Sequence, residues 1–166
     1  RSADLFGILN GVDYREWAPE TDRYIAACYS ADAMQGKSVC KAELQRVMGL
    51  PEEADLPLIG VVSRMVKQKG IDTLATALPE LLKLDLQLVM LGEGEPWAHF
   101  YFGGMAAQYP DKMKVVIGYD NALAHRIEAG ADFFLMPSAF EPCGLNQMYS
   151  MRYGTLPIVR ATGGLD

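Results

Sequence analysis

The sequence predicts an α/β fold with a doubly wound parallel sheet. From Leu58 onward, short apolar segments rich in β-branched residues alternate with longer segments whose apolar residues recur at helical spacing. The short segments are apolar along their length, as strands are when both faces of their sheet are covered. Strands that alternate with helices of this length form right-handed βαβ units and lie side by side in parallel.

Five strands and five helices follow from this pattern. The strands are expected at residues 58–62, 86–91, 114–117, 132–136 and 156–159. The helices are expected at residues 37–48, 70–84, 96–109, 122–130 and 145–153. Pro79 weakens the prediction of the second helix, and Gly103 and Gly104 weaken that of the third. We interpret residues 1–57 as a linker segment that leads into a domain formed by residues 58–166.

The composition excludes several classes of protein. The chain has 166 residues and a formal charge of −6, whereas non-specific binding of nucleic acid requires clustered basic residues. We expect no membrane segment and no secretory signal, because no apolar run is long enough to cross a bilayer. Three widely spaced cysteines predict neither a disulfide framework nor a metal site, which favours a cytoplasmic location. The chain starts with Arg1 and stops at Asp166, just after a strand, so we expect a fragment truncated at its C-terminal end.

Polar residues follow the expected strands, where ligands bind in open parallel sheets. Arg64 and Lys69 follow the first strand, and cations there could stabilise the charge of a departing nucleoside diphosphate. Tyr119 follows the third strand and could stack on a nucleotide base. Gly163 and Gly164 follow the last strand and would let the backbone approach a phosphate or sugar. Each group also has a purely structural interpretation. The two cations could belong to a solvated loop, the tyrosine could be partly buried in the core, and the two glycines could form a tight turn.

The fourth strand is followed by Glu141-Pro142-Cys143-Gly144 and then by a helix that begins at Leu145. Backbone N–H groups at a helix start can receive an anion or sugar hydroxyls, and the carboxylate can accept hydrogen bonds from hydroxyls. The same carboxylate could instead respond only to the helix dipole. The cysteine could line a pocket wall or be a small buried residue, and no histidine lies near it in sequence to make it a nucleophile.

Six short motifs of the chain are distinctive. They are Ile8-Leu9-Asn10-Gly11-Val12-Asp13, Ser63-Arg64 with Gln68-Lys69-Gly70, His125-Arg126-Ile127, Glu141-Pro142-Cys143-Gly144-Leu145-Asn146-Gln147, Tyr153-Gly154-Thr155-Leu156-Pro157 and Thr162-Gly163-Gly164-Leu165. In this order and spacing they closely resemble bacterial glycogen synthases and plant starch synthases. Wider families of retaining glycosyltransferases usually carry a second glutamate eight positions after the first, where this chain has Tyr149.

The resemblance implies the C-terminal half of the two-domain GT-B fold, in which a Rossmann-like domain faces a second one across a cleft. It implies transfer of glucose from ADP-glucose to the non-reducing 4-hydroxyl of an α-1,4-glucan, with retention of configuration and without a metal ion or other cofactor. By this resemblance, Arg64 and Lys69 hold the departing diphosphate. Glu141 and the backbone at residues 143–145 grip the donor glucose, and Tyr119 packs on the base.

The resemblance also implies partners. They are the nucleotide-sugar donor, the glucan acceptor and the family's N-terminal domain, which this chain lacks, so we expect the isolated fragment to be inactive. Asn10 would reach the cleft from the linker side. Two alternatives stay open. The first is another retaining GT-B transferase such as a sucrose synthase, and the second is a non-catalytic nucleotide- or glucan-binding module. ADP-glucose is favoured over UDP-glucose only by the bacterial character of the motifs.

Overall fold

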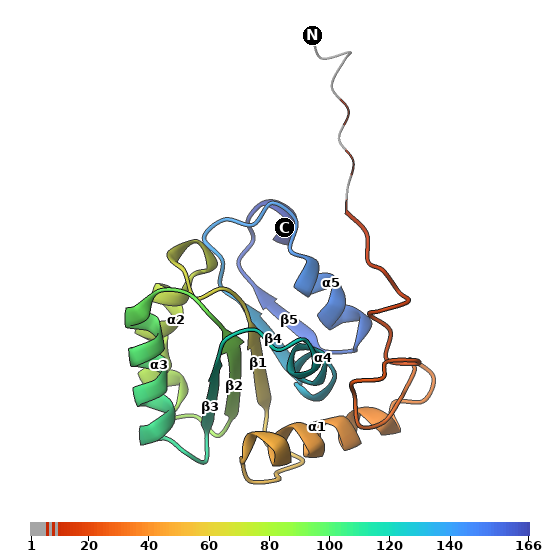
Figure 1. Ribbon diagram of the computed structural model, residues 1–166, viewed down its shortest axis with the longest axis horizontal. Coiled ribbons are helices and arrows are strands. Elements are labelled where there is room, and N and C mark those ends of the chain that lie inside the picture. The colour runs from red at the N-terminus through yellow and green to blue at the C-terminus, as the bar shows by residue number, and fades with distance from the viewer. Residues whose placement is uncertain (1–5, 7, 9) are drawn as a thin grey trace.

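The structure is a computed structural model that describes residues 6, 8 and 10–166. Arg1 and Leu9, on which two of the sequence expectations draw, lie outside the described residues. Five parallel strands form one sheet in the order β3-β2-β1-β4-β5 (Figure 1). The predicted fold class is confirmed, and each strand lies within one residue of its predicted bounds. The strands are β1 (Leu58–Val62), β2 (Gln87–Gly92), β3 (Met113–Ile117), β4 (Phe133–Met136) and β5 (Leu156–Val159).

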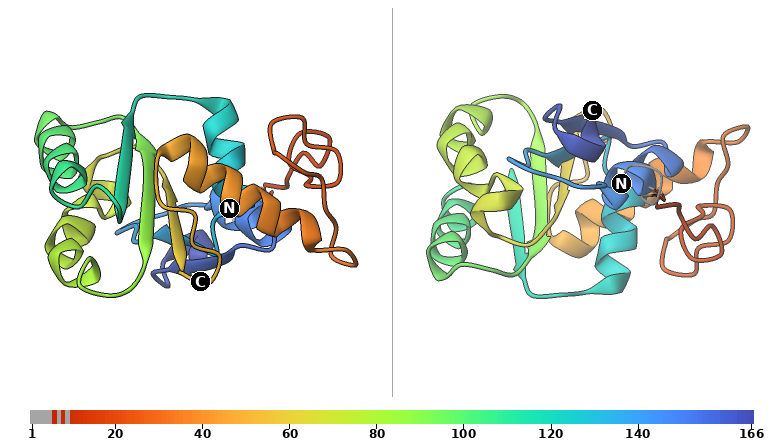
Figure 2. Two further views of the ribbon diagram at one scale, coloured as in Figure 1. Left: turned by 90° about the horizontal axis from the view of Figure 1, so that it is seen from below. Right: turned by 90° about the horizontal axis from the view of Figure 1, so that it is seen from above.

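Helices cover both faces of the sheet, as the doubly wound prediction requires. Helices α2 and α3 lie on one face, and α1, α4 and α5 lie on the other (Figure 2). Two 3-10 turns, η2 and η3, follow β1 and β5. The bounds are α1 (Gln35–Met48), η2 (Lys67–Lys69), α2 (Ile71–Leu81), α3 (Pro96–Gln108), α4 (Asn121–Gly130), α5 (Leu145–Arg152) and η3 (Gly163–Leu165).

Strand β2 shows why the strands are apolar throughout. Leu88 and Met90 point into the core beneath α2 and α3, while Val89 and Leu91 point into the core beneath α1 and α4. Successive side chains of a strand alternate between the two faces of its sheet. Because both faces are covered, every residue of this strand is buried.

Helix α2 continues past Pro79, which has no N–H to donate to the carbonyl of Ala75. The hydroxyl of Tyr101, on the neighbouring α3, donates a hydrogen bond to that carbonyl over 2.7 Å. The lost helical bond is therefore replaced from outside the helix. The helix ends at Leu81, three residues before the end predicted at residue 84.

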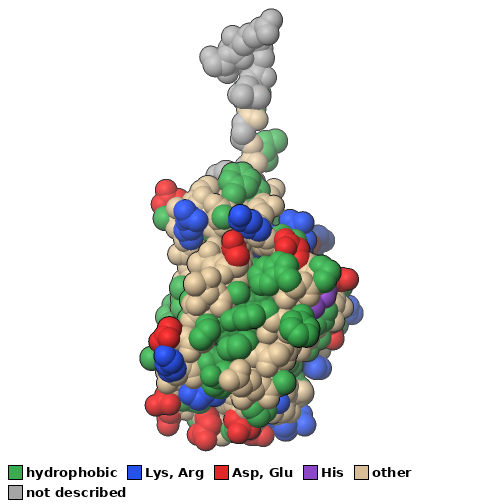
Figure 3. Space-filling model, turned by 90° about the vertical axis from the view of Figure 1, so that its left-hand side faces the viewer, with side chains coloured by type: hydrophobic (Ala, Val, Ile, Leu, Met, Phe, Trp, Pro, Cys, Tyr) green, Lys and Arg blue, Asp and Glu red, His purple; other side chains and the backbone are tan. Residues whose placement is uncertain are grey.

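Helix α3 has no charged residue, and its outer side is partly apolar. Ala98 and Phe102 are buried in the core, whereas Trp97 and Phe100 are exposed. Hydrophobic side chains gather on this side of the molecule (Figure 3). Among the described residues, no helix is long and apolar enough to cross a membrane.

The segment before α1 is held to the sheet domain by a buried cluster of aromatic and polar side chains. The indole of Trp17 stacks between the rings of His125 and Tyr149, with centroid distances of 3.8 and 4.0 Å. Asp22 accepts a hydrogen bond from the Tyr153 hydroxyl (2.6 Å) and lies 2.7 Å from Nδ1 of His125. Burial alone would raise the pKa of Asp22, but these hydrogen bonds hold it below its ordinary value. The division at residue 57 stays a prediction.

Candidate active site

A cavity of about 500 Å³ opens at the carboxyl ends of the strands. It lies where β1 has β2 on one side and β4 on the other. The chain leaves β1 for helices on one face and leaves β4 for a helix on the other, which makes this the topological switch point of the sheet. Ligands bind at this position in open α/β sheets, and the residues following β1, β2, β3 and β4 all contribute to the wall.

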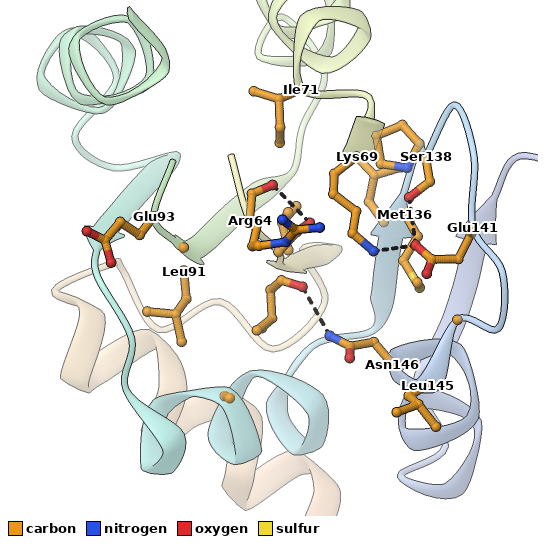
Figure 4. Close-up of a pocket in the computed structure, with 18 of the residues that line it drawn as sticks. Arg64, Lys69, Ile71, Leu91, Glu93, Met136, Ser138, Glu141, Leu145 and Asn146 are labelled. Carbon is orange, nitrogen blue, oxygen red and sulfur yellow. Dashed lines mark hydrogen bonds and ion pairs between the residues drawn. The ribbon is translucent and has the colours of Figure 1, made fainter. Parts of the chain in front are cut away.

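Lys69 and Glu141 form an ion pair across the switch point (Figure 4). Lys69 ends the η2 turn after β1, and Glu141 lies in the loop after β4. Their side chains are only 20% and 9% exposed. The Ser138 hydroxyl lies 3.3 Å from the same carboxylate oxygen and donates a second hydrogen bond. The two charges are therefore held in place before any ligand is bound.

Arg64 projects beside this pair and has no fixed partner. Its guanidinium makes no hydrogen bond or ion pair with any residue that the structure describes, and it is exposed on the cavity wall. Figure 4 shows the side chain between Glu93 and Lys69. The wall thus carries a neutralised pair, a free cation and the carboxylate of Glu93.

The loops that carry these groups are joined through their backbones. The N–H of Ala139 donates to the carbonyl of Gln68 over 2.9 Å. Gly70 has a φ of +71°, and a Cβ there would lie 1.9 Å from the carbonyl oxygen of Pro137. Only glycine fits this position, because both the conformation and the close approach exclude a side chain. The ion pair therefore rests on two loops in direct contact.

Gly163 and Gly164 support the site from behind. The N–H of Gly164 donates to the carbonyl of Glu141 over 2.8 Å. A Cβ at Gly163 would lie 2.2 Å from that oxygen, and one at Gly164 would lie 2.3 Å from the carbonyl oxygen of Cys143. The two glycines pack under the loop after β4 and do not form part of the cavity wall. Their direct contact with a donor stays a prediction.

The other predicted residues line the cavity. Cys143, Gly144 and Leu145 form the wall beside Glu141, at the start of α5. Tyr119 is 85% exposed, and within the described part of the chain its hydroxyl donates only to Asn121, which leaves the ring face open to a ligand. Asn10 also contributes to the wall. Apart from the two glycines, the structure thus brings every predicted site residue to one cavity.

Two side chains at the site have no role assigned to them in the sequence analysis. Glu93 lines the wall after β2, and Asn146 donates from Nδ2 to the carbonyl of Val62 over 3.0 Å, which ties α5 to the end of β1. Glu93 comes directly after β2, so the rule that polar residues after strands converge could have found it, whereas Asn146 lies within α5. No group of three or more metal-ligating side chains gathers within the described part of the chain. Independence from metal stays a prediction.

The fold and the site define a Rossmann-like domain with its binding site at the switch point of the sheet. The family model of glycosyl transferases group 1 matches residues 47–166, and the chain belongs to this family. The predicted resemblance to glycogen and starch synthases is confirmed by the relatives described next.

The chain is 69% identical to glycogen synthase 1 of Geobacter metallireducens and 58% identical to a glycogen synthase of Anaeromyxobacter, over all 166 residues. It covers 33% and 35% of those proteins, so it spans about a third of their length. Among solved structures, it is similar to the catalytic domain of starch synthase IV from Arabidopsis thaliana, bound to ADP and acarbose. That likeness has a TM-score of 0.92 at 42% identity and covers 99% of this chain and 34% of the other.

Proposed function

We propose that this chain is the donor-binding domain of a glycogen (starch) synthase. The complete enzyme would transfer glucose from ADP-glucose to the non-reducing 4-hydroxyl of an α-1,4-glucan, with retention of configuration. The observation that carries this proposal is the meeting of Arg64, Lys69 and Glu141 in one cavity at the switch point. The relatives named glycogen synthase and the ADP bound in the Arabidopsis structure support it.

Arg64 and Lys69 would stabilise the leaving group. Breaking the bond between glucose and phosphate leaves negative charge on the diphosphate oxygens, and fixed cations there lower the barrier. Arg64 has a free planar guanidinium, which can bind two phosphate oxygens at once. Lys69 adds a point charge whose position is set by its pair with Glu141. Two cations of the chain would thus supply the charge neutralisation, and we propose that no metal is required.

Glu141 would orient the glucose. Its carboxylate is largely buried, already accepts hydrogen bonds from Lys69 and Ser138, and retains acceptor capacity for a sugar hydroxyl. Cys143 and Leu145 line the adjoining wall. On this proposal the sugar lies at the end of β4 and the diphosphate at the end of β1. Tyr119 would then pack on the base at the end of β3.

The acceptor and the remainder of the enzyme belong to the proposal only. We propose that the α-glucan approaches from a second domain that faces this cavity, with Asn10 contributing from the linker. The chain by itself would bind nucleotide without synthesising glucan. A cytoplasmic location is proposed from the three free cysteines and the bacterial relatives.

Calorimetric titration of the chain with ADP, and with UDP for comparison, tests the donor site. We expect saturable ADP binding that weakens at least tenfold in Arg64→Ala/Lys69→Ala, because two phosphate-binding cations are lost. Arg46→Ala/Lys83→Ala is the matched control, since it removes two exposed cations that pair only with neighbours on their own helical segments. Equal loss in both double variants would contradict the assignment of the diphosphate site. Replacement of Glu141 in the complete enzyme should abolish glucan synthesis, and persistence of synthesis would favour a non-catalytic binding module.

A further inference from the structure

Glu93 is the carboxylate of the cavity wall that has no role in the site described above. We infer that it binds the ribose hydroxyls of the nucleotide and so selects ribonucleotides over deoxyribonucleotides. The inference rests on the proposed function, because it takes the diphosphate to lie at Arg64 and Lys69. It adds to that function a specificity residue for the sugar of the nucleotide.

The order of the strands carries the first step. Along the sheet, the cavity wall presents Tyr119 after β3, Glu93 after β2, Arg64 after β1 and Glu141 after β4. Neighbouring strands lie about 4.8 Å apart, so these four positions span roughly 14 Å. Glu93 lies across the cavity from Glu141, with Arg64 and Lys69 between them (Figure 4).

A nucleoside diphosphate sugar is bonded in the order base, ribose, diphosphate and sugar. If the base packs on Tyr119 and the diphosphate lies at Arg64, the ribose that joins them falls at the end of the intervening strand, β2. Glu93 is the first residue after that strand. Dinucleotide-binding Rossmann folds likewise use an acidic residue of the domain to accept hydrogen bonds from ribose hydroxyls.

The chemistry of Glu93 fits a diol. An ionised carboxylate only accepts hydrogen bonds, and a ribose offers two neighbouring O–H donors. The same carboxylate would repel a phosphate, so its favourable use in this cavity is toward hydroxyls. Glu141 cannot take this part, because it lies at the other side of the cavity, in the loop after β4.

The backbone at Glu93 is fixed while its side chain is uncommitted. The carbonyl of Glu93 accepts a hydrogen bond from the N–H of Met65 over 2.8 Å, and a Cβ at Gly92 would lie 1.9 Å from the carbonyl oxygen of Ser63. The carboxylate is exposed, and no described residue donates a hydrogen bond to it or pairs with it. It extends away from Arg64 in Figure 4 and can turn toward a ligand without breaking a contact.

Titration with ADP and with 2′-deoxy-ADP tests the inference. We expect the chain to bind ADP roughly tenfold more tightly than the deoxy compound, the effect of one hydrogen bond to a charged group. In Glu93→Ala this ratio should fall to about one through a loss of ADP affinity, and in Glu93→Gln it should be intermediate. Glu95→Ala is the matched control, because Glu95 is the neighbouring acid outside the cavity wall, bonded to Trp97.

The outcomes separate the inference from the proposed function. A ratio unchanged by Glu93→Ala, with ADP binding still dependent on Arg64 and Lys69, would overturn the role of Glu93 and leave the donor site intact. A ratio of one in the unaltered chain would overturn it as well. Absence of ADP binding altogether would overturn both the donor site and the ribose contact. Thermal unfolding of each variant shows that it is folded, which we expect because Glu93 is exposed.

Discussion

Lys69→Met is the perturbation that tests most directly how the candidate site is built. Methionine keeps the apolar length of the lysine and removes its charge. The variant leaves the carboxylate of Glu141, 9% exposed, with Ser138 as its one remaining hydrogen-bond donor among the described residues. An uncompensated carboxylate in this position should lower the free energy of unfolding.

The magnitude follows from the exposure of the two side chains. Removing one partner of a fully buried ion pair costs about 3–5 kcal/mol, and removing one partner of an exposed pair costs about 0–1 kcal/mol. Glu141 lies near the buried limit, whereas Lys69 is 20% exposed and partly screened by water. We therefore expect a loss of about 2 kcal/mol, which lowers the melting temperature of a chain of this size by roughly 4–8 °C.

A double-mutant cycle with Glu141→Gln isolates the pair. Denaturant unfolding of the two single variants and of Lys69→Met/Glu141→Gln should give a coupling energy of about 1–2 kcal/mol. A coupling energy below about 0.5 kcal/mol would refute the pair as a structural contact.

Further predictions concern buried and helix-stabilising contacts outside the cavity. Asp22→Asn should lower the free energy of unfolding in denaturant by about 3 kcal/mol, because it breaks a buried, charge-assisted hydrogen-bond network. Asp32→Asn is the control and should change it very little, since Asp32 is exposed. Because the pKa of Asp22 is lowered in the folded chain, its contribution to the free energy of unfolding is present above about pH 4 and is lost as the pH falls further. The same loss of stability with falling pH in Asp22→Asn would contradict this. Tyr101→Phe should lower the free energy of unfolding by about 1–2 kcal/mol, because the carbonyl of Ala75 is left without a donor. Tyr109→Phe is the control and should lower it less, since the Tyr109 hydroxyl makes no hydrogen bond with a described residue. Equal losses would contradict the bond from Tyr101 to α2. Burial lowers the pKa of Lys37 to about 8. From pH 8 to about 10 the unfolded chain therefore binds more protons than the folded chain, and the free energy of unfolding should rise with pH over that range. A rise of the same size in Lys37→Met would exclude Lys37 as its cause.

The fold could be predicted because each element has a local signal. Strands buried on both faces are apolar along their length, and the helices carry apolar residues at a period that needs no knowledge of their partners. The pattern predicts the end of this helix at residue 84 because Leu82 and Leu84 continue the apolar spacing, although α2 ends at Leu81. Its passage through Pro79 depends on a hydroxyl from α3, which no local signal reveals.

For the candidate site, the sequence predicts where the residues lie along the sheet but not the contacts between them. The rule that ligands bind at the carboxyl edge of a parallel sheet predicts that Arg64, Lys69 and Glu141 lie at one site. It could not show that Lys69 pairs with Glu141, because 72 residues separate them and the pairing depends on two loops packed through Gly70. Nor could it show that Gly163 lies behind the loop and not on the cavity wall, since a close approach to backbone and a close approach to ligand require the same residue type.

Tyr149 joins the segment before α1 to helix α5. Wider families of retaining glycosyltransferases usually carry a glutamate at this position, whereas here the ring stacks on Trp17, which also stacks on the buried His125. A carboxylate could not take part in such a stack, so the aromatic residue at 149 and the indole at 17 are understood as one docking contact. Seven residues before Trp17, Asn10 reaches the cavity wall. The segment before α1 is thereby fixed to α4 and α5, and this explains how Asn10 of the same segment becomes part of the cavity wall.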